Sequence, residues 1–347
     1  MSLVFIESFD HYSAAQLGWK WNTIVGILSG TILSAAGRRS TAAFVVSTAT
    51  ARTLQKTVCN ASCYVVGFAF KANTAPTAAD RGLLQFLDAG TVHLELGIST
   101  AGTLAITRGA GVTVLSSYAI ALNTGQFYYV EMKAEISNSI SAGGVEVRLD
   151  GVSIMTLAAG ADSQNAGTAQ INQILIGATG NIGAEDFRFD DLYMLDTLGT
   201  EYKNFLGDMR VDALVISNVG TVASWSPSSA GATMLSMIAS AHPDSNVTYM
   251  FASAASDTQR FGFSGLVSAN GSIYAVQLNL AVAKSDTTSV MQVAGLFFSG
   301  SVSGIGSTTT VGNTSYAYVL MITSADASGA SWSSNTINKT EFGIKII

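Results

Sequence analysis

The stretch FYYVEMKAEI, residues 127–136, decides the fold class. Its first apolar set occupies every second position: Tyr128, Val130, Met132, Ala134 and Ile136. The positions between them hold Tyr129, Glu131, Lys133 and Glu135. A period of two places the two sets on opposite faces of a half-buried β-strand. We therefore predict a strand here, with the first set in a core and the second set facing water.

The next run along the chain, VEVRLDG at residues 145–151, repeats this pattern. Val145 and Val147 alternate with the charged Glu146 and Arg148. Asp150-Gly151 is a typical hairpin turn, and the apolar run VSIMTL follows it. We predict a hairpin at this turn, and antiparallel pairing of its first strand with residues 127–136.

Most of the chain repeats this pattern, in which short runs of strand-forming residues are separated by Gly, Asn, Asp and Ser. The one helix-like segment is TMLSMIASA, residues 233–241, which Pro243 closes. These features predict an all-β protein. A change in composition within residues 196–206 predicts a boundary near Gly199, with a β-sandwich at residues 1–199 and a second, smaller β-sandwich at residues 200–347.

The composition excludes several classes of protein. Of the 347 residues 48% are hydrophobic and 12% are charged, with a net charge of −6, so the chain is not disordered. Lys and Arg are too scattered for a nucleic-acid surface. The most apolar run, residues 21–37, is interrupted by polar residues, and the first residues lack a basic region. We therefore expect neither a membrane span nor export by a signal peptide.

The low share of charged residues is about half that of an average soluble protein. Residues 213–241 contain no charged residue at all. Interfaces in permanent assemblies lose charge in this way, so we expect a homo-oligomer, with a trimer favoured. The alternating segment 341–346 predicts a terminal edge strand that a neighbouring subunit covers.

The acids and histidines form no catalytic motif in the sequence. Glu131 and Glu135 lie on one predicted strand face about 13 Å apart, too far for retaining glycoside hydrolysis, with a lysine between them. That pattern is typical of a solvated face. His11, His93 and His242 belong to no nucleophile motif. The sequence therefore predicts no catalytic residue and no enzymatic activity.

The sequence also predicts no metal and no cofactor. Cys59 and Cys63 lack the partners of a zinc site, and we expect free thiols, with a local disulfide as the alternative. Asp190-Asp191 and the preceding Glu185-Asp186 could ligate calcium, but a structural role at a strand end is favoured. Four amide side chains near predicted loops could bind sugar hydroxyls: Gln164, Asn165, Asn172 and Gln173.

The chain resembles virion proteins of tailed bacteriophages that contain a concanavalin A-like, or laminin G-like, sandwich. The first half carries this resemblance in FIESFDHY with Trp19 and Trp21, and then in FYYVEMKAEI, VEVRLDG and FRFDDLYMLD. FLGDMRVDAL, HPDSNVTYM and the final Trp332 with NTINKTEFGIKI extend it over nearly the whole chain.

This resemblance implies a concanavalin A-like jelly roll in the first half and a virion location, with assembly in the host cytoplasm. The expected function is that of a structural protein that decorates the capsid or is attached to the tail or neck. The alternative is a tail or fibre protein for host adhesion that binds surface polysaccharide. The expected partners are other virion proteins and further copies of the same chain.

Overall fold

The computed structural model describes residues 3–347, except 27, 29–30, 48–50, 140–141, 158–161, 181–182, 184, 239–241, 267–270 and 313. Strands account for 49% of the chain and helices for 5%, so the all-β prediction is confirmed. The chain divides into two compact units, Met1–Asp212 and Ala213–Ile347. This division lies after the boundary that the composition predicted near Gly199. No described helix has the length and apolar character needed to cross a membrane.

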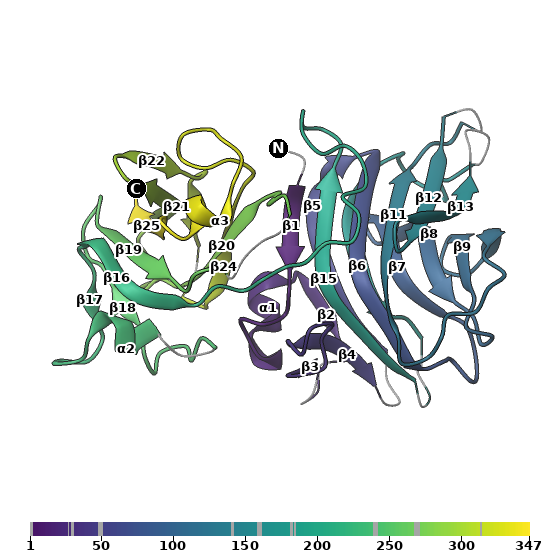
Figure 1. The fold of residues 1–347 in the computed structure, drawn as a ribbon, viewed down its shortest axis with the longest axis horizontal. Helices are drawn as coiled ribbons and strands as arrows, with labels where there is room; N and C mark the ends of the chain where they lie inside the picture. The colour runs from purple at the N-terminus through teal and green to yellow at the C-terminus, as the bar shows by residue number, and fades with distance from the viewer. Residues whose placement is uncertain are drawn as a thin grey trace. The chain divides into compact units, whose positions relative to one another are not determined.

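The first unit is a sandwich of two antiparallel sheets (Figure 1). One sheet has the order β13-β12-β11-β6-β15-β4-β3, and β1 also pairs with β15. Its strands are β1 (Leu3–Glu7), β3 (Ile32–Leu33), β4 (Ala43–Ser47), β6 (Cys63–Thr74), β11 (Phe127–Glu135), β12 (Gly144–Leu149), β13 (Val152–Leu157) and β15 (Asp186–Asp196). We call it the eight-stranded sheet.

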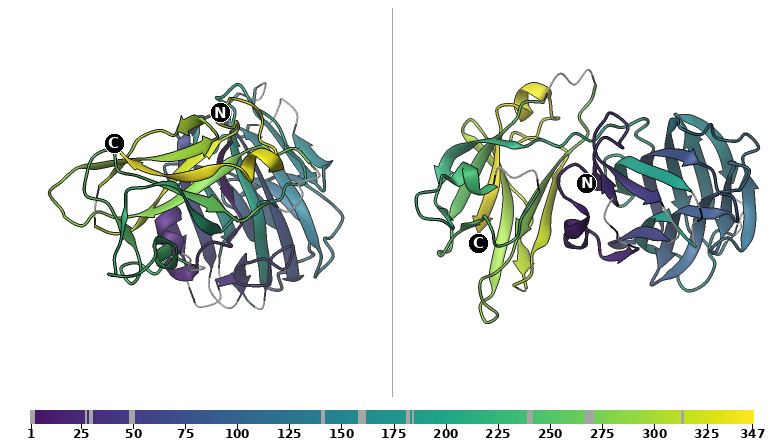
Figure 2. Two further views of the ribbon diagram at one scale, coloured as in Figure 1. Left: turned by 60° about the vertical axis from the view of Figure 1, so that its left-hand side comes forward. Right: turned by 90° about the horizontal axis from the view of Figure 1, so that it is seen from below.

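The opposing seven-stranded sheet has the order β10-β9-β8-β7-β14-β5-β2. Its strands are β2 (Thr23–Val25), β5 (Arg52–Ala61), β7 (Arg81–Asp88), β8 (Thr91–Ile98), β9 (Leu104–Arg108), β10 (Thr113–Ser117) and β14 (Ile171–Ala178). A short 3-10 helix η1 (Ala14–Gln16) and helix α1 (Leu17–Lys20) follow β1. Figure 2 shows the same sheets from two further directions.

The predicted strand and hairpin are both present, but Tyr129, which was predicted to face water, is fully buried and donates a hydrogen bond to Asp191 O. Val130 and Met132 of β11 are fully buried, and β11 pairs antiparallel with β12. At the β12–β13 turn, Asp150 and Gly151 have φ of 50° and 81°. Two successive positive φ values match the right-handed twist of a hairpin, which explains the Asp-Gly pair.

Strand β15 contains a bulge that the alternation in FRFDDLYMLD does not reveal. The register to β6 shifts between Asp190 and Tyr193, and Asp191 has a φ of 48°. Before the shift, Phe189 lies opposite Phe70 and faces the core between the sheets. After the shift, Tyr193 lies opposite Gly67, on the other face of the eight-stranded sheet. Unbroken alternation from Phe187 and Phe189 predicts Tyr193 in the same core, and the bulge instead turns it to the opposite face.

The second unit contains a six-stranded sheet of order β16-β19-β25-β21-β22, with β23 also paired to β21, and two separate strand pairs. The six-stranded sheet consists of β16 (Ile216–Ala223), β19 (Thr258–Phe263), β21 (Met291–Ser299), β22 (Val302–Ile305), β23 (Thr309–Val311) and β25 (Glu341–Ile346). The pairs are β17 (Ser226–Pro227) with β18 (Met250–Phe251) and β20 (Val276–Val282) with β24 (Ala317–Thr323). The helices are α2 (Met234–Ile238) and α3 (Ser334–Ile337).

The last strand of the chain is not an edge strand, so that prediction is wrong. β25 pairs with β19 on one side and with β21 on the other, and Phe342 lies opposite both Phe261 and Phe297. Its backbone groups therefore bond within the unit, and its apolar face meets the core around Trp332. The helix predicted at residues 233–241 is present as α2, and residues 239–241 lie outside the described part of the chain.

Candidate functional site

Six neighbouring strands of the seven-stranded sheet align a row of side chains, which we call the polar row. Cross-strand register joins its members in the order Thr107, Glu95, Gln85, Leu175, Gln55 and Thr23. Neighbouring strands lie about 4.8 Å apart, so five steps give a row about 24 Å long. The row is mostly polar and runs across the strands.

The polar row lies on the sheet face that points away from the core. The residues that alternate with it are fully buried and apolar, including Leu84 and Phe86 on β7 and Leu94 and Leu96 on β8. These side chains face the eight-stranded sheet. Because neighbouring positions on a strand point to opposite faces, Gln85 and the other row members face outward.

The centre of the polar row is a carboxylate held by an amide. The Gln85 side-chain amide donates a hydrogen bond to Oε2 of Glu95. Glu95 is 6% exposed and Gln85 is 4% exposed, although both lie on the outer face. Burial raises the pKa of Glu95, and the hydrogen bond from Gln85 opposes that shift. In the described part of the chain, Gln85 is the hydrogen-bond partner of this carboxylate and bonds to Oε2, so Oε1 accepts no hydrogen bond from the described residues.

Glycines surround the Glu95 carboxylate. A Cβ atom at Gly82 would lie 2.1 Å from Glu95 Oε2, so the carboxylate rests directly over this glycine backbone. Cβ atoms at Gly97 and Gly111 would lie 3.9 and 3.8 Å from Oε1. The absence of a Cβ atom at Gly82 is what lets the carboxylate lie this close to the sheet backbone.

Three of the four amide side chains that the sequence suggested for sugar binding hold loops, and Asn165 contributes its backbone instead. Asn172 accepts a hydrogen bond from Ala89 N at 2.9 Å, and Gln173 accepts one from Gly90 N at 2.8 Å, so both hold the β7–β8 turn. Gln164 donates to Gly167 O, and the Asn165 backbone N–H donates to His93 Nδ1. Gln85 and Glu95 were not among the predicted residues. Their alternation with apolar neighbours on adjacent strands was the available signal.

The paired acids of FRFDDLYMLD hold separate parts of the first unit. Asp190 accepts from Arg38 N at 2.8 Å, and Asp191 pairs with Arg39 at 2.9 Å. Burial, followed by the charge of Asp191, raises the pKa of Asp190 to about 7. Each acid thus anchors the loop before β4.

The two acids before them have partners of their own. Glu185 pairs with the buried Arg81 at 3.0 Å, and Asp186 pairs with Arg188 at 3.2 Å. Across the residues that the structure describes, no three His, Cys, Asp or Glu side chains gather as a metal site.

The prediction that Glu131 lies on a solvated face is wrong. Its side chain is fully buried, and Oε1 accepts hydrogen bonds from Tyr193 OH and from Gly207 N at 2.9 Å. Gly207 belongs to residues 200–212, which we call the strap. Leu206 N of the strap also bonds to Tyr193 OH, and Asp208 pairs with Arg38. Glu135 remains exposed. Alternation placed Glu131 on the correct sheet face but could not reveal that the strap covers it.

The histidines and cysteines lie in different settings. His11 lies 3.8 Å from the buried Glu7 carboxylate, and His93 is fully buried under the loop that contains Asn165. His242 is exposed in a loop of the second unit. Cys59 and Cys63 are free thiols, and they lie on β5 and β6 rather than on one strand.

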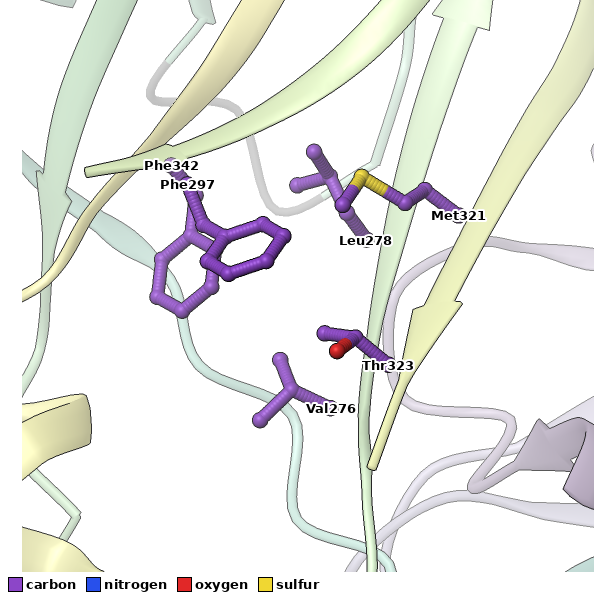
Figure 3. Close-up of a pocket in the computed structure, with 6 residues that line it drawn as sticks. All are labelled: Val276, Leu278, Phe297, Met321, Thr323 and Phe342. Atoms are coloured by element: carbon purple, nitrogen blue, oxygen red, sulfur yellow. The ribbon is translucent and has the colours of Figure 1, made fainter. Parts of the chain in front are cut away.

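The second unit contains an apolar gap between the β20–β24 pair and the six-stranded sheet (Figure 3). Its lining residues are Val276, Leu278, Phe297, Met321, Thr323 and Phe342. The Phe297 and Phe342 rings lie on one side of this gap and Met321 on the other. The gap has no room for a water molecule, so it belongs to the packing of the core.

The first unit is a β-sandwich, and solved structures with a jelly-roll β-sandwich fold are similar to it. Alginate lyase Aly36B is similar with a TM-score of 0.44 and 10% identity, over 57% of this chain and 98% of the lyase. The cellulose-induced protein Cip1 is similar with a TM-score of 0.38 and 17% identity, over 51% of this chain and 86% of Cip1.

The carbohydrate-binding module CBM66 of Bacillus subtilis is similar with a TM-score of 0.32 and 9% identity, over 44% of this chain and 86% of the module. No protein-family model matches the sequence, and no curated protein matches it.

This comparison corrects the expectation that the chain has no enzymatic activity. The fold is shared with polysaccharide-degrading enzymes, of which the alginate lyase is an example. The earlier exclusion rested on Glu131, Glu135 and the histidines, and it took no account of Gln85 and Glu95.

Proposed function

We propose that the first unit binds polysaccharide along the polar row of its seven-stranded sheet. The observation that carries this proposal is the alignment of polar side chains over six strands, centred on Glu95 and Gln85. A row about 24 Å long offers repeated hydrogen-bonding positions, which suit a chain of repeating sugar units better than a compact small molecule.

The setting that we propose is the virion of a tailed phage, where the first unit contacts the polysaccharide of the host surface. The virion setting, the attachment to other virion proteins and the assembly in the host cytoplasm rest on the sequence resemblance described above. In this proposal the first unit serves adhesion and the second unit serves attachment.

A purely structural role in the capsid, neck or tail is the second candidate, and the second unit favours it. Large apolar side chains of this unit are exposed, with Val215 at 63%, Val247 at 74% and Val290 at 78%. Residues 213–241 add no charge to its surface. Surfaces of this kind suit contact with other subunits, and we propose a homo-oligomer, with a trimer favoured.

Affinity electrophoresis of the full chain in gels that contain single polysaccharides tests the binding proposal. Gln85→Ala removes the amide that holds Glu95. The substitution also removes Gln85 Oε1, an acceptor that this proposal offers to a sugar hydroxyl. Because one such hydrogen bond contributes about 0.5–1.5 kcal/mol, we expect binding weaker by about two- to tenfold. Glu135→Gln, on the other sheet, is the control and should bind like the unchanged protein. Retardation that Gln85→Ala leaves intact would contradict the placement of the site.

A further inference from the structure

We infer that the polar row selects uncharged, hydroxyl-rich polysaccharides and rejects polyuronates and other polyanions. This inference rests on the proposed polysaccharide-binding function and adds the chemical class of the ligand. It follows from two properties of the surface around Glu95: its charge, and the balance between open hydrogen-bond acceptors and occupied donors.

The charge of the row is carried by one carboxylate. Its six positions hold Glu95 together with uncharged Thr, Gln and Leu side chains, and none of them is Lys or Arg. Arg108, at the end of β9, is already paired with Asp162. Among the described residues, no Lys or Arg forms an ion pair with Glu95, and the causes of its pKa shift are burial and the Gln85 hydrogen bond. A bound carboxylate or sulfate would meet this negative charge where burial weakens solvent screening.

The hydrogen-bonding groups lead to the same selection. One of the two Gln85 amide N–H groups is used by Glu95 Oε2, Gly111 N donates to Thr107 Oγ1 at 3.3 Å, and Gly82 N donates to Thr179 Oγ1 at 3.1 Å. The acceptors left at the centre, the Oε1 atoms of Glu95 and Gln85, therefore outnumber the one remaining N–H of Gln85. Sugar hydroxyls can donate to these oxygens. Ionised carboxylates and sulfates only accept, so they would leave the acceptors unsatisfied.

The test uses ligand pairs that share a backbone and differ in charge. Polygalacturonate and alginate are each compared with their carboxyl-reduced forms, in which a hydroxyl replaces the carboxylate, and dextran and mannan are added as neutral polymers. Binding of the full chain is measured at pH 7.5 by affinity electrophoresis and titration calorimetry. We expect the reduced member of any bound pair to bind at least about tenfold tighter, or about 1.4 kcal/mol.

The variant Glu95→Gln removes the charge and keeps the shape. In this variant the ratio of the affinity for the reduced polymer to that for the polyuronate should fall towards one, because the polyuronate binds more tightly. Glu135→Gln should keep the ratio of the unchanged protein. Equal or tighter binding of the polyuronate by the unchanged protein would overturn the inference, and this comparison does not depend on the variant folding. A preference that survives Glu95→Gln would also overturn it. Absence of binding to every polymer would instead refute the proposed function itself.

Discussion

Replacement of Lys20 by Met tests the buried ion pair that joins helix α1 to β1. Lys20 Nζ lies 2.9 Å from Glu7 Oε2, and both side chains are completely buried. At an effective dielectric constant of about 20, two unit charges at this separation attract by about 6 kcal/mol, and desolvation of both ions offsets much of that energy. Removal of the cation alone leaves a buried carboxylate. We expect Lys20→Met to lower the free energy of unfolding of the first unit by about 3–5 kcal/mol.

The double variant Glu7→Gln with Lys20→Met separates the charge from the packing. The carbonyl of the introduced glutamine side chain can still accept from Phe9 N, which now donates to Glu7 Oε1 at 2.8 Å. With both charges of this pair removed, the variant should recover most of the lost stability. Lys203→Met is the control, since Lys203 is exposed and its replacement should change the stability by less than about 0.5 kcal/mol.

The measurement is urea unfolding of the full chain at pH 7, followed by fluorescence and near-ultraviolet circular dichroism. Burial pushes the pKa of Glu7 upward, but the charges of Lys20 and His11 and the hydrogen bond from Tyr12 hold it below its ordinary value. The contribution of the Glu7 carboxylate is therefore present above its unfolded pKa and is lost as the pH falls through the folded pKa. A loss below about 1 kcal/mol for Lys20→Met would refute the reasoning, since exposed ion pairs contribute that little. A double variant no more stable than the single variant would refute it as well.

Three further predictions concern the eight-stranded sheet and the strap. The pKa of Asp190 is raised from 3.8 to about 7, so between these pH values the folded state holds a proton that the unfolded state has released. The stability contributed by this group should therefore fall as the pH rises from about 4 to about 7. A profile of unfolding free energy against pH should be flatter in this range for Asp190→Asn than for the unchanged protein. In Gly67→Ala the new Cβ atom would lie 2.3 Å from the Tyr193 ring, too close for a normal contact. This overpacking beneath the strap should lower the free energy of unfolding by about 1–3 kcal/mol in the same urea assay. Limited proteolysis with mass spectrometry should yield a first-unit fragment that ends after Asp212, because the strap is bonded to the sheet, and an early cut near Gly199 would contradict this.

The sequence by itself determined the fold class and many of the core positions. Alternation in residues 127–136 identified Val130 and Met132 as core residues, and Asp150-Gly151 identified the hairpin. These features are readable because strand alternation and turn conformation are local properties of the chain. Similar reasoning predicted an alternating strand at the C-terminus, and that strand is present as β25.

Only the tertiary structure decided which strands are neighbours and what covers each sheet face. It placed β25 inside its sheet, covered Glu131 with the strap and turned Tyr193 outward at the bulge of β15. It also brought Gln85 and Glu95 into contact in the polar row. Each of these outcomes depends on pairing between segments that are not adjacent in sequence, and a bulge of one residue reverses every side-chain direction after it. Alternation within a strand carries no information about its partner, so the candidate site could not be assembled from the sequence alone.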